Sequence, residues 1–334
     1  MTLDAATLLP LIFAALMALS LCVYAILDGF DLGVGLVLPL GSEEERNMML
    51  ASIGPFWDAN ETWLVLGIGL LLIAFPTAHG QILGALYLPV AVLLIGLILR
   101  GVAFDFRAKA PARHRLLWDN LFFAGSVLAT ASQGYMLGRY VLAFESNLMA
   151  ESFAILSALC VTSAYAFIGN SWLVLKTEGA LQRRSVTWAK RALWLTALGI
   201  IAVSIVNPLV SPVIFERWFA LPEAIALMPI PLTCGGAMVA AGYYLHSFER
   251  RDRRWDALPF LAAILVFFLS FLGLAYSFYP DVVPGQLTVW EAAAATDSLA
   301  FMGVGVAIVF PAIIGYTLLS YRVFWGKAEA LVYH

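Results

Sequence analysis

The sequence predicts an all-α integral membrane protein with nine membrane-spanning helices. Of its 334 residues, 62% are apolar and only 12% are charged, and the mean hydropathy is +0.89. A soluble domain usually has about 25% charged residues. The apolar residues also form runs of about 20 or more, the length with which an α-helix crosses a bilayer. The strands of a membrane barrel would be shorter and would alternate apolar with polar positions, a pattern that this sequence does not show.

Nine segments are long and apolar enough to span a bilayer. They cover approximately residues 7–38, 50–75, 79–103, 116–141, 149–175, 188–207, 223–246, 256–278 and 297–322. The first is longer than one crossing requires, so we expect its end to project from the membrane or to bend near Gly29, Gly33 and Gly35.

We expect the nine segments to form one membrane domain that covers residues 1–334. Segments 1 to 4 occupy about 7–141, segments 5 to 8 about 149–278, and the ninth about 297–322. The connections between them are shorter than about 20 residues, which leaves no room for a separate soluble domain.

Basic residues predict the orientation, because short cytoplasmic loops are enriched in lysine and arginine. They follow the third, fifth, seventh and ninth segments, whereas the opposite loops contain little beyond Arg139 and Arg217. The N-terminus is therefore expected outside and the C-terminus in the cytoplasm, which requires an odd number of spans. The loop GSEEERN fits less well because it is mostly acidic, but acidic residues contribute little to orientation. The basic residues are Arg107, Lys109, Arg113, Arg115, Lys176, Arg183, Arg184, Lys190, Arg191, Arg250, Arg251, Arg253, Arg254, Arg322 and Lys327.

Ionisable residues interrupt or end the first three segments. They are Asp28, Asp31, Asp58, Glu61, Arg100, Asp105 and Lys109. A charged side chain inside a bilayer is costly unless it is paired, hydrated or neutralised, so such residues usually have a task. In the predicted orientation all of them lie in the cytoplasmic half of the membrane. At about 1.5 Å per residue, Asp58 and Glu61 would lie roughly 12–17 Å along the second segment, deeper than Asp28 and Asp31.

Spacing groups four of the carboxylates into two pairs, Asp28 with Asp31 and Asp58 with Glu61, because residues three apart share a helix face. Two carboxylates close together in a poorly hydrated site do not easily both ionise, so each pair should bind a proton or have a cationic partner. Arg100 is the predicted structural counter-ion. Asp58 and Glu61 suit a proton pathway, although a purely structural ion-pair network would use the same residues. Asp28 and Asp31 suit either a proton pathway or the capping of a helix end.

No metal or redox centre is predicted in this chain. A haem between membrane helices needs His, Met or Cys ligands, and the histidines lie at helix ends, in loops or at the terminus. The three cysteines are isolated from one another. Trp57 and Trp63, which flank the second acidic pair, are either ordinary packing residues or the lining of an oxygen or quinone route. The lysines and arginines of the loops are explained by the orientation of the chain in the membrane, and no nucleic acid partner is expected.

Several motifs resemble subunit II of the cytochrome bd family of quinol oxidases. The first three are DGFDLGVG, WDANETWLV and RGVAFDFRAK, and LTVWEAAAATDSL and YRVFWGK extend the resemblance to the end of the chain. The short length and compact outer loops resemble the cyanide-insensitive branch of the family. Residues 125–275 match only in hydropathy and in the number of segments.

The resemblance implies a role within a larger enzyme of the bacterial inner membrane. Family members have nine helices, arranged as two four-helix bundles plus one peripheral helix, and pair with a homologous subunit I. That partner carries haems b and d and oxidises quinol, and the complex reduces dioxygen to water with protons from the cytoplasm. The resemblance leaves open whether a structural quinone or small single-helix accessory subunits bind.

The resemblance also implies roles for individual residues. Asp58, Asp105 and Lys109 match the family's proton route at the subunit interface, and Trp63 matches a position associated with oxygen. Some relatives have a neutral amide in place of Glu61, so Glu61 is not expected to be indispensable.

A proton-coupled secondary transporter is the alternative function, because buried carboxylates with an arginine also mark ion pathways. Transporters often carry broken helices in corresponding halves of the chain. Here the charged residues are concentrated in the first three segments. The sequence therefore favours a non-haem oxidase subunit, which performs no redox chemistry alone.

Overall fold

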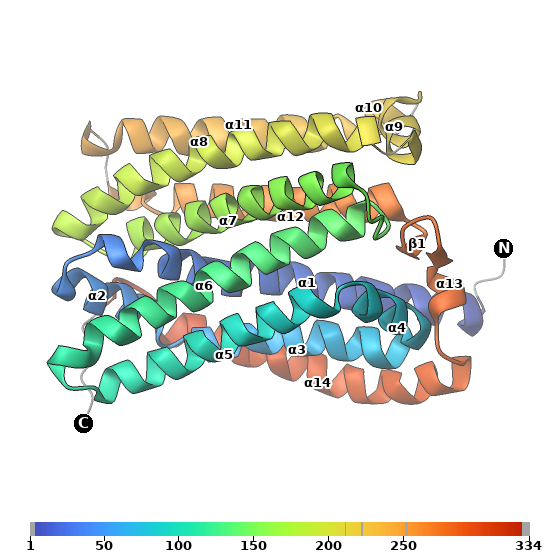
Figure 1. Ribbon diagram of the computed structural model, residues 1–334, viewed down its shortest axis with the longest axis horizontal. Coiled ribbons are helices and arrows are strands. Elements are labelled where there is room, and N and C mark those ends of the chain that lie inside the picture. The colour runs from blue at the N-terminus through green and yellow to red at the C-terminus, as the bar shows by residue number, and fades with distance from the viewer. Residues whose placement is uncertain (1–3, 211, 222, 251–252, 329–334) are drawn as a thin grey trace.

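The computed structural model describes residues 4–210, 212–221, 223–250 and 253–328. The described chain is an elongated bundle in which the long helices run along the same axis (Figure 1). Arg251, one of the basic residues used to predict the orientation, lies outside the described residues. The longest helices are α1 (Ala5–Val37), α6 (Ala112–Val141), α7 (Leu148–Lys176), α8 (Gly179–Val210) and α14 (Thr296–Val323).

Eight helical stretches among the described residues are long and apolar enough to cross a membrane. They are Ala5–Leu40, Trp57–Ala74, Tyr87–Lys109, Leu148–Lys176, Gly179–Leu209, Ala224–His246, Leu258–Phe278 and Thr296–Val323. These stretches confirm an all-α protein with multiple membrane helices. The predicted segment 116–141 also folds as a helix, α6, but α6 is less apolar and buries polar residues such as Asp119, Ser126 and Thr130.

The predicted bounds of the second and third segments are wrong. Residues 50–75 are divided between α2 (Glu43–Ile53) and α3 (Trp57–Ala74). The break contains Gly54 and Pro55, and proline has no backbone N–H to continue a helix. Residues 79–103 are divided in the same way between α4 (Pro76–Ala85) and α5 (Tyr87–Lys109), and Pro89 cannot donate to the carbonyl of Ala85.

The glycines near the end of α1 mark a close helix crossing. α1 is continuous through Gly29, Gly33 and Gly35, so the predicted bend is not needed to explain them. A Cβ added to Gly33 would lie 1.9 Å from the carbonyl oxygen of Tyr165, and one added to Gly169 would lie 2.3 Å from the carbonyl carbon of Gly33. Small residues at such crossings let two membrane helices pack backbone against backbone. α1 and α7 are therefore joined at the centre of the molecule.

Two further long helices are α11 (Pro229–His246) and α12 (Leu258–Phe278). Shorter elements connect the long helices: the 3-10 turns at Leu38–Leu40, Phe248–Arg250 and Arg253–Trp255, then α9 (Pro212–Phe219), α10 (Glu223–Leu227), β1 (Asp281–Val283), β2 (Leu287–Thr288) and α13 (Val289–Ala292). The two strands pair antiparallel, with Asp281 opposite Thr288. Thr288 and Glu291 form a capping box at the start of α13, and the hydrogen bonds from Thr288 lower the pKa of the Glu291 carboxyl.

The basic residues gather at one end of the bundle. The connections after α5, α7 and α11 and the end of α14 lie at this end, on the left of Figure 1, and α1 begins at the opposite end. Here Arg107 of α5 donates to buried Asp119 of α6, and the Arg46 Nε atom of α2 lies 3.1 Å from the same carboxylate. Two arginines on one carboxylate hold α2 against the ends of α5 and α6.

The helix α1 lies inside the bundle. It contacts α3, α6, α7, α12 and α14. Its last two turns are almost entirely buried, including Phe30, Leu32 and Val34 at 0% exposure. Any charged side chain on this part of α1 must therefore find its partner within the protein.

Candidate functional site

A buried ion-pair cluster joins the first three spanning helices. The Arg100 Nη2 atom on α5 lies 2.5 Å from the Asp28 Oδ1 atom on α1, and the same nitrogen donates to the carboxylate of Glu61 on α3. The side chains of Arg100 and Asp28 are 0% exposed, whereas that of Glu61 is 26% exposed. Arg100 therefore links two acidic residues that are 33 positions apart in the sequence, one of which reaches the surface.

A second branch of the cluster contains Asp31. The Asn60 Nδ2 atom donates to the Asp31 Oδ2 atom at 2.7 Å and to the carbonyl oxygen of Leu27 at 3.3 Å. The Tyr321 hydroxyl on α14 donates to the Asn60 Oδ1 atom at 3.2 Å. Asp31 is 0% exposed, and its hydrogen-bond partner is a neutral amide.

A hydrogen-bonded chain continues from the cluster into α6 and α7. The Tyr165 hydroxyl donates to the Gln133 Oε1 atom at 2.6 Å, and the Gln133 Nε2 atom donates to the Tyr24 hydroxyl at 2.9 Å. Tyr24 lies one turn before Asp28 on α1 and is close to its carboxylate. Because Tyr24 accepts from Gln133, its own proton is free to point at Asp28.

The cluster has more negative than positive groups. Asp28, Asp31 and Glu61 face the single guanidinium of Arg100. Four buried atoms also have no hydrogen-bond partner: Asp28 Oδ2, Asp31 Oδ1, Arg100 Nε and Arg100 Nη1. Buried polar atoms are normally satisfied by protein or ordered water. The geometry therefore has both the charge and the open bonding positions to accept protons or water.

Burial within the protein does not follow the predicted order of depth in the membrane, which stays a prediction. Asp58 is exposed and Glu61 is half-buried, whereas Asp28 and Asp31 are fully buried. The turn at residues 54–56 places Asp58 in the first turn of α3, and α1 is enclosed by other helices. Asp28 and Asp31 lie inside α1 rather than at its end, and their partners are the side chains of Arg100 and Asn60.

The other predicted pathway residues lie on the surface of this chain. Asp58, Asp105 and Lys109 are exposed, on α3 and α5. Asp58 is close enough to Glu61 for their charges to repel. The structure thus brings Asp28, Asp31, Glu61 and Arg100 together and leaves Asp58, Asp105 and Lys109 facing outward.

The two tryptophans have different surroundings. Trp63 is 3% exposed and packs against Phe310, with ring centroids 5.9 Å apart, and its Nε1 atom has no hydrogen-bond partner. Trp57 is half-buried and packs on Phe104 at 5.1 Å. Packing against aromatic neighbours accounts for the position of each ring.

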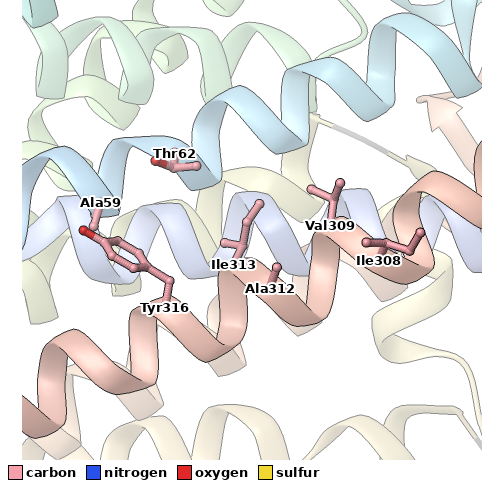
Figure 2. A pocket seen from close by; sticks show the side chains of 7 residues that line it. All are labelled: Ala59, Thr62, Ile308, Val309, Ala312, Ile313 and Tyr316. Carbon is pink, nitrogen blue, oxygen red and sulfur yellow. The ribbon is translucent and has the colours of Figure 1, made fainter.

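An apolar groove of about 320 Å³ lies beside the cluster, between α3 and α14. Figure 2 shows two lining residues, Ala59 and Thr62, on α3, facing a row of five side chains on α14. That row is Ile308, Val309, Ala312, Ile313 and Tyr316. Neither Trp57 nor Trp63 lines the groove, so it is distinct from the route predicted for these residues.

Sequence reasoning did not identify Asn60, Tyr321, Tyr24 or Gln133 as members of the cluster. Asn60 lies within the WDANETW motif, and a buried amide in an apolar segment is a signal that could have been used. Tyr321 gives no such signal, because it lies 261 positions from Asn60. Among the residues that the structure describes, no group of three His, Cys, Asp or Glu residues is placed to hold a metal ion.

Comparisons with known proteins agree with one another. The family model for cytochrome bd terminal oxidase subunit II matches residues 9–324. The chain is 28% identical over 318 residues to cytochrome bd ubiquinol oxidase subunit 2 of Bacillus subtilis (strain 168), covering 89% of this chain and 90% of the relative. It is 25% identical over 369 residues to cytochrome bd-I ubiquinol oxidase subunit 2 of Escherichia coli (strain K12), covering 96% of this chain and 95% of the relative.

The fold has a solved counterpart as well. A chain in the structure of bd oxidase from Geobacillus thermodenitrificans superimposes with a TM-score of 0.73 at 17% sequence identity, covering 96% of this chain and 99% of that chain. At this identity the likeness concerns the fold. The family model, which spans nearly the whole sequence, shows that this chain belongs to the cytochrome bd terminal oxidase subunit II family.

Proposed function

We propose that this chain is the non-haem subunit of a quinol:dioxygen oxidoreductase in the bacterial inner membrane, where it pairs with a haem-bearing subunit I and supplies part of a cytoplasmic proton route. One observation supports this most directly. Asp58, Asp105 and Lys109 are exposed on membrane helices, beside a buried acidic cluster that half-buried Glu61 connects to the surface. Charges exposed to lipid are costly, so such a face is expected to be covered by another protein.

The partner would cover the face formed by α3, α5 and α14. α14 buries only Leu299 and Phe310 within this chain and exposes large apolar side chains such as Phe301 and Ile308. The groove between α3 and α14 lies on the same face. A subunit docked here would bury Asp58, Asp105 and Lys109 and provide partners for their charges.

Protons would pass from the exposed carboxylates to the buried ones. Asp58 and Asp105 would take up protons at the interface, and the positive charge of Lys109 would offset their negative charge. Glu61 would connect this surface to the buried Arg100 and Asp28. Full ionisation of Asp28, Asp31, Glu61 and Arg100 would leave an excess of two negative charges in a largely buried site. Because isolated buried charges are very costly, the cluster is expected to retain protons.

The remaining assignments follow the family. The haems b and d would belong to subunit I, and quinol and dioxygen would be substrates of the whole complex. We propose nine spans, with α6 as the fourth, the N-terminus outside and the C-terminus in the cytoplasm. α1, α3, α5 and α6 would form one bundle and α7, α8, α11 and α12 the other, with α14 peripheral. A structural quinone, single-helix accessory subunits and a role for Trp57 and Trp63 in oxygen or quinone access stay hypotheses.

Purification followed by visible spectroscopy tests this function. The tagged chain, solubilised in mild detergent, is expected to bring down a haem-rich membrane partner whose spectrum contains both b-type and d-type bands. A haem-free chain that catalyses proton-coupled solute uptake in vesicles would contradict the proposal and support a transporter. The concentration of the charged cluster in α1, α3 and α5 already argues against that alternative.

Asp58→Asn is expected to slow quinol oxidation at least about tenfold while leaving haem content intact, since general acid–base groups contribute about 10²–10⁴-fold. The substitution removes a proton acceptor without changing the size of the side chain. Turnover with quinol would be followed by oxygen consumption between pH 5.5 and 9. Asp297→Asn, an exposed carboxylate in the first turn of α14, is the matched control. Unchanged turnover at every pH would remove Asp58 from the route, and loss of haem would indicate a structural role.

A further inference from the structure

The chain after α14 folds back onto the end of α7. α14 ends at Val323, and the Ala328 backbone N–H donates to the carbonyl oxygen of Lys176 at 2.7 Å. The helices α7 and α14 both run toward the same end of the molecule (Figure 1), so their C-termini meet there. We call residues 324–328 the C-terminal tail.

Two lysines cap these helix ends reciprocally. The Lys176 Nζ atom, from the last turn of α7, donates to the carbonyl oxygens of Phe324 at 2.8 Å and Gly326 at 2.9 Å, which follow α14. The Lys327 Nζ atom, from the tail, donates to the carbonyl oxygens of Leu175 at 2.8 Å and Thr177 at 3.1 Å, at the end of α7. Cations at helix C-termini bind the unpaired carbonyls and the negative end of the dipole.

Buried partners hold both lysines in place. Lys176 is 7% exposed and lies 5.0 Å from the ring centroid of Trp172 and 5.5 Å from that of Phe56. Lys327 pairs with Asp256 at 3.0 Å. Asp256 is 4% exposed and also accepts hydrogen bonds from Gln182 and Tyr244, each at 2.7 Å. A buried carboxylate with three donors is a fixed anchor for the tail.

The second half of α14 has little else to hold it. None of its residues from Pro311 to Val323 is buried. The Tyr321 ring stacks on Phe56, with ring centroids 4.6 Å apart, and Phe56 also contacts Phe324 and Trp172. The tail, Phe56 and Tyr321 thus form one packed unit around Lys176.

This unit reaches the acidic cluster through one hydrogen bond. The Tyr321 hydroxyl donates to Asn60, and Asn60 in turn donates to Asp31. The titratable and charged groups that face Asp31 are Asp28 on α1, Glu61 on α3, Arg100 on α5 and Tyr321 on α14. Among these groups, Tyr321 lies on α14, the helix that the tail continues.

We propose that the C-terminal tail is a latch, and that Tyr321 is a positioning residue through which this latch orients Asn60 toward Asp31. The latch consists of Lys176, Lys327 and Asp256. It holds the end of α14 and with it the Tyr321 hydroxyl. That hydroxyl holds the Asn60 amide, whose Nδ2 atom donates to the carboxylate of Asp31. The assignment of Tyr321 rests on the proposed proton route, whereas the latch itself does not.

Hydrogen exchange tests the latch in the complex of this chain with its haem-bearing partner. Lys327→Gln removes a charge-assisted contact, so amide exchange across residues 311–323 is expected to rise about tenfold. Arg322→Gln is the matched control, because Arg322 is exposed in the same turn as Tyr321 and loses the same charge. Exchange that is equal in Lys327→Gln, Asp256→Asn and the Arg322→Gln control would overturn the latch.

The pH profile of quinol oxidation tests the positioning role. Tyr321→Phe keeps the ring on Phe56 and removes only the hydroxyl, so the fold should persist. With Asn60 less well held, ionised Asp31 is less stabilised, and the profile should move to higher pH by about 0.3–1 unit. Lys327→Gln should shift it in the same direction, and Lys327→Arg should restore it in part.

Four variants separate the positioning role from the proton route. If Asp31→Asn changes the profile but Tyr321→Phe and Lys327→Gln do not, the positioning role is wrong while the proton route stands. If Asp31→Asn and Asp58→Asn both leave the profile unchanged, the proton route and the positioning role are wrong together. The exchange experiment still decides the latch in that case.

Discussion

Arg100→Gln is expected to destabilise the folded chain by about 3–5 kcal/mol, the usual cost of removing one partner from a buried ion pair. The substitution leaves the carboxylates of Asp28 and Glu61 without their common counter-ion, and Asp28 has no access to solvent. The thermal unfolding midpoint of the purified complex, followed by tryptophan fluorescence, should fall clearly. Arg113→Gln, an exposed arginine at the start of α6, should change it little.

A double variant distinguishes a lost ion pair from general damage. Asp28→Asn combined with Arg100→Gln removes both charges of the pair whose two side chains are fully buried, so part of the stability should return. Glu61 is partly exposed, so water can stabilise its charge when Arg100 is removed. Leaving Glu61 without Arg100 should therefore cost less than leaving Asp28 without it. If the double variant is as unstable as the sum of the two single variants, Asp28 and Arg100 do not interact as described.

Gly33→Ala is expected to have the other large effect, a destabilisation of about 3 kcal/mol or more, at the upper end of the cost of overpacking a core. The new methyl group would lie 1.9 Å from the carbonyl oxygen of Tyr165, a backbone atom that no side-chain rotation can remove. α1 and α7 would have to separate, and the buried residues around the crossing would lose their packing. The yield of assembled complex and its unfolding midpoint should both fall.

Gly69→Ala on α3 is the matched control for this crossing. A Cβ at Gly69 meets no atom within 4 Å, and alanine has a helix propensity better than glycine by about 1 kcal/mol. The control should therefore be neutral or slightly stabilising. Equal behaviour of Gly33→Ala and Gly69→Ala would show that α1 and α7 are not in backbone contact at Gly33.

Local sequence patterns were sufficient for the class of protein and for the family. The apolar runs predicted membrane helices, because the length of a run and its lack of charge are properties of consecutive residues. The motifs around Asp28, Asp58 and Arg100 indicated the subunit II family, which the family model confirms. Eight helices long and apolar enough to cross a membrane were recovered among the described residues, with shifted bounds where Pro55 and Pro89 interrupt the predicted segments.

Burial could not be predicted in the same way. The chain position of Asp58 predicted its depth along a segment but not how much of it the protein covers, and the structure exposes Asp58 and buries Asp31. Depth along one helix says nothing about which neighbouring helices enclose it. α1 is surrounded by other helices, and that arrangement depends on contacts such as Gly33 with Tyr165, which no local pattern reveals.

The sequence by itself determined that this protein crosses a membrane, that its charged residues are concentrated in the first three spanning segments, and which family it belongs to. Only the tertiary structure decided that Arg100 is shared by Asp28 and Glu61, and that Asp31 is reached from Tyr321 through Asn60. The physical reason is the range of the interactions. Hydropathy and motif are set by neighbours in the chain, whereas an ion pair or a hydrogen bond joins residues 39 or 261 positions apart only after the helices have packed.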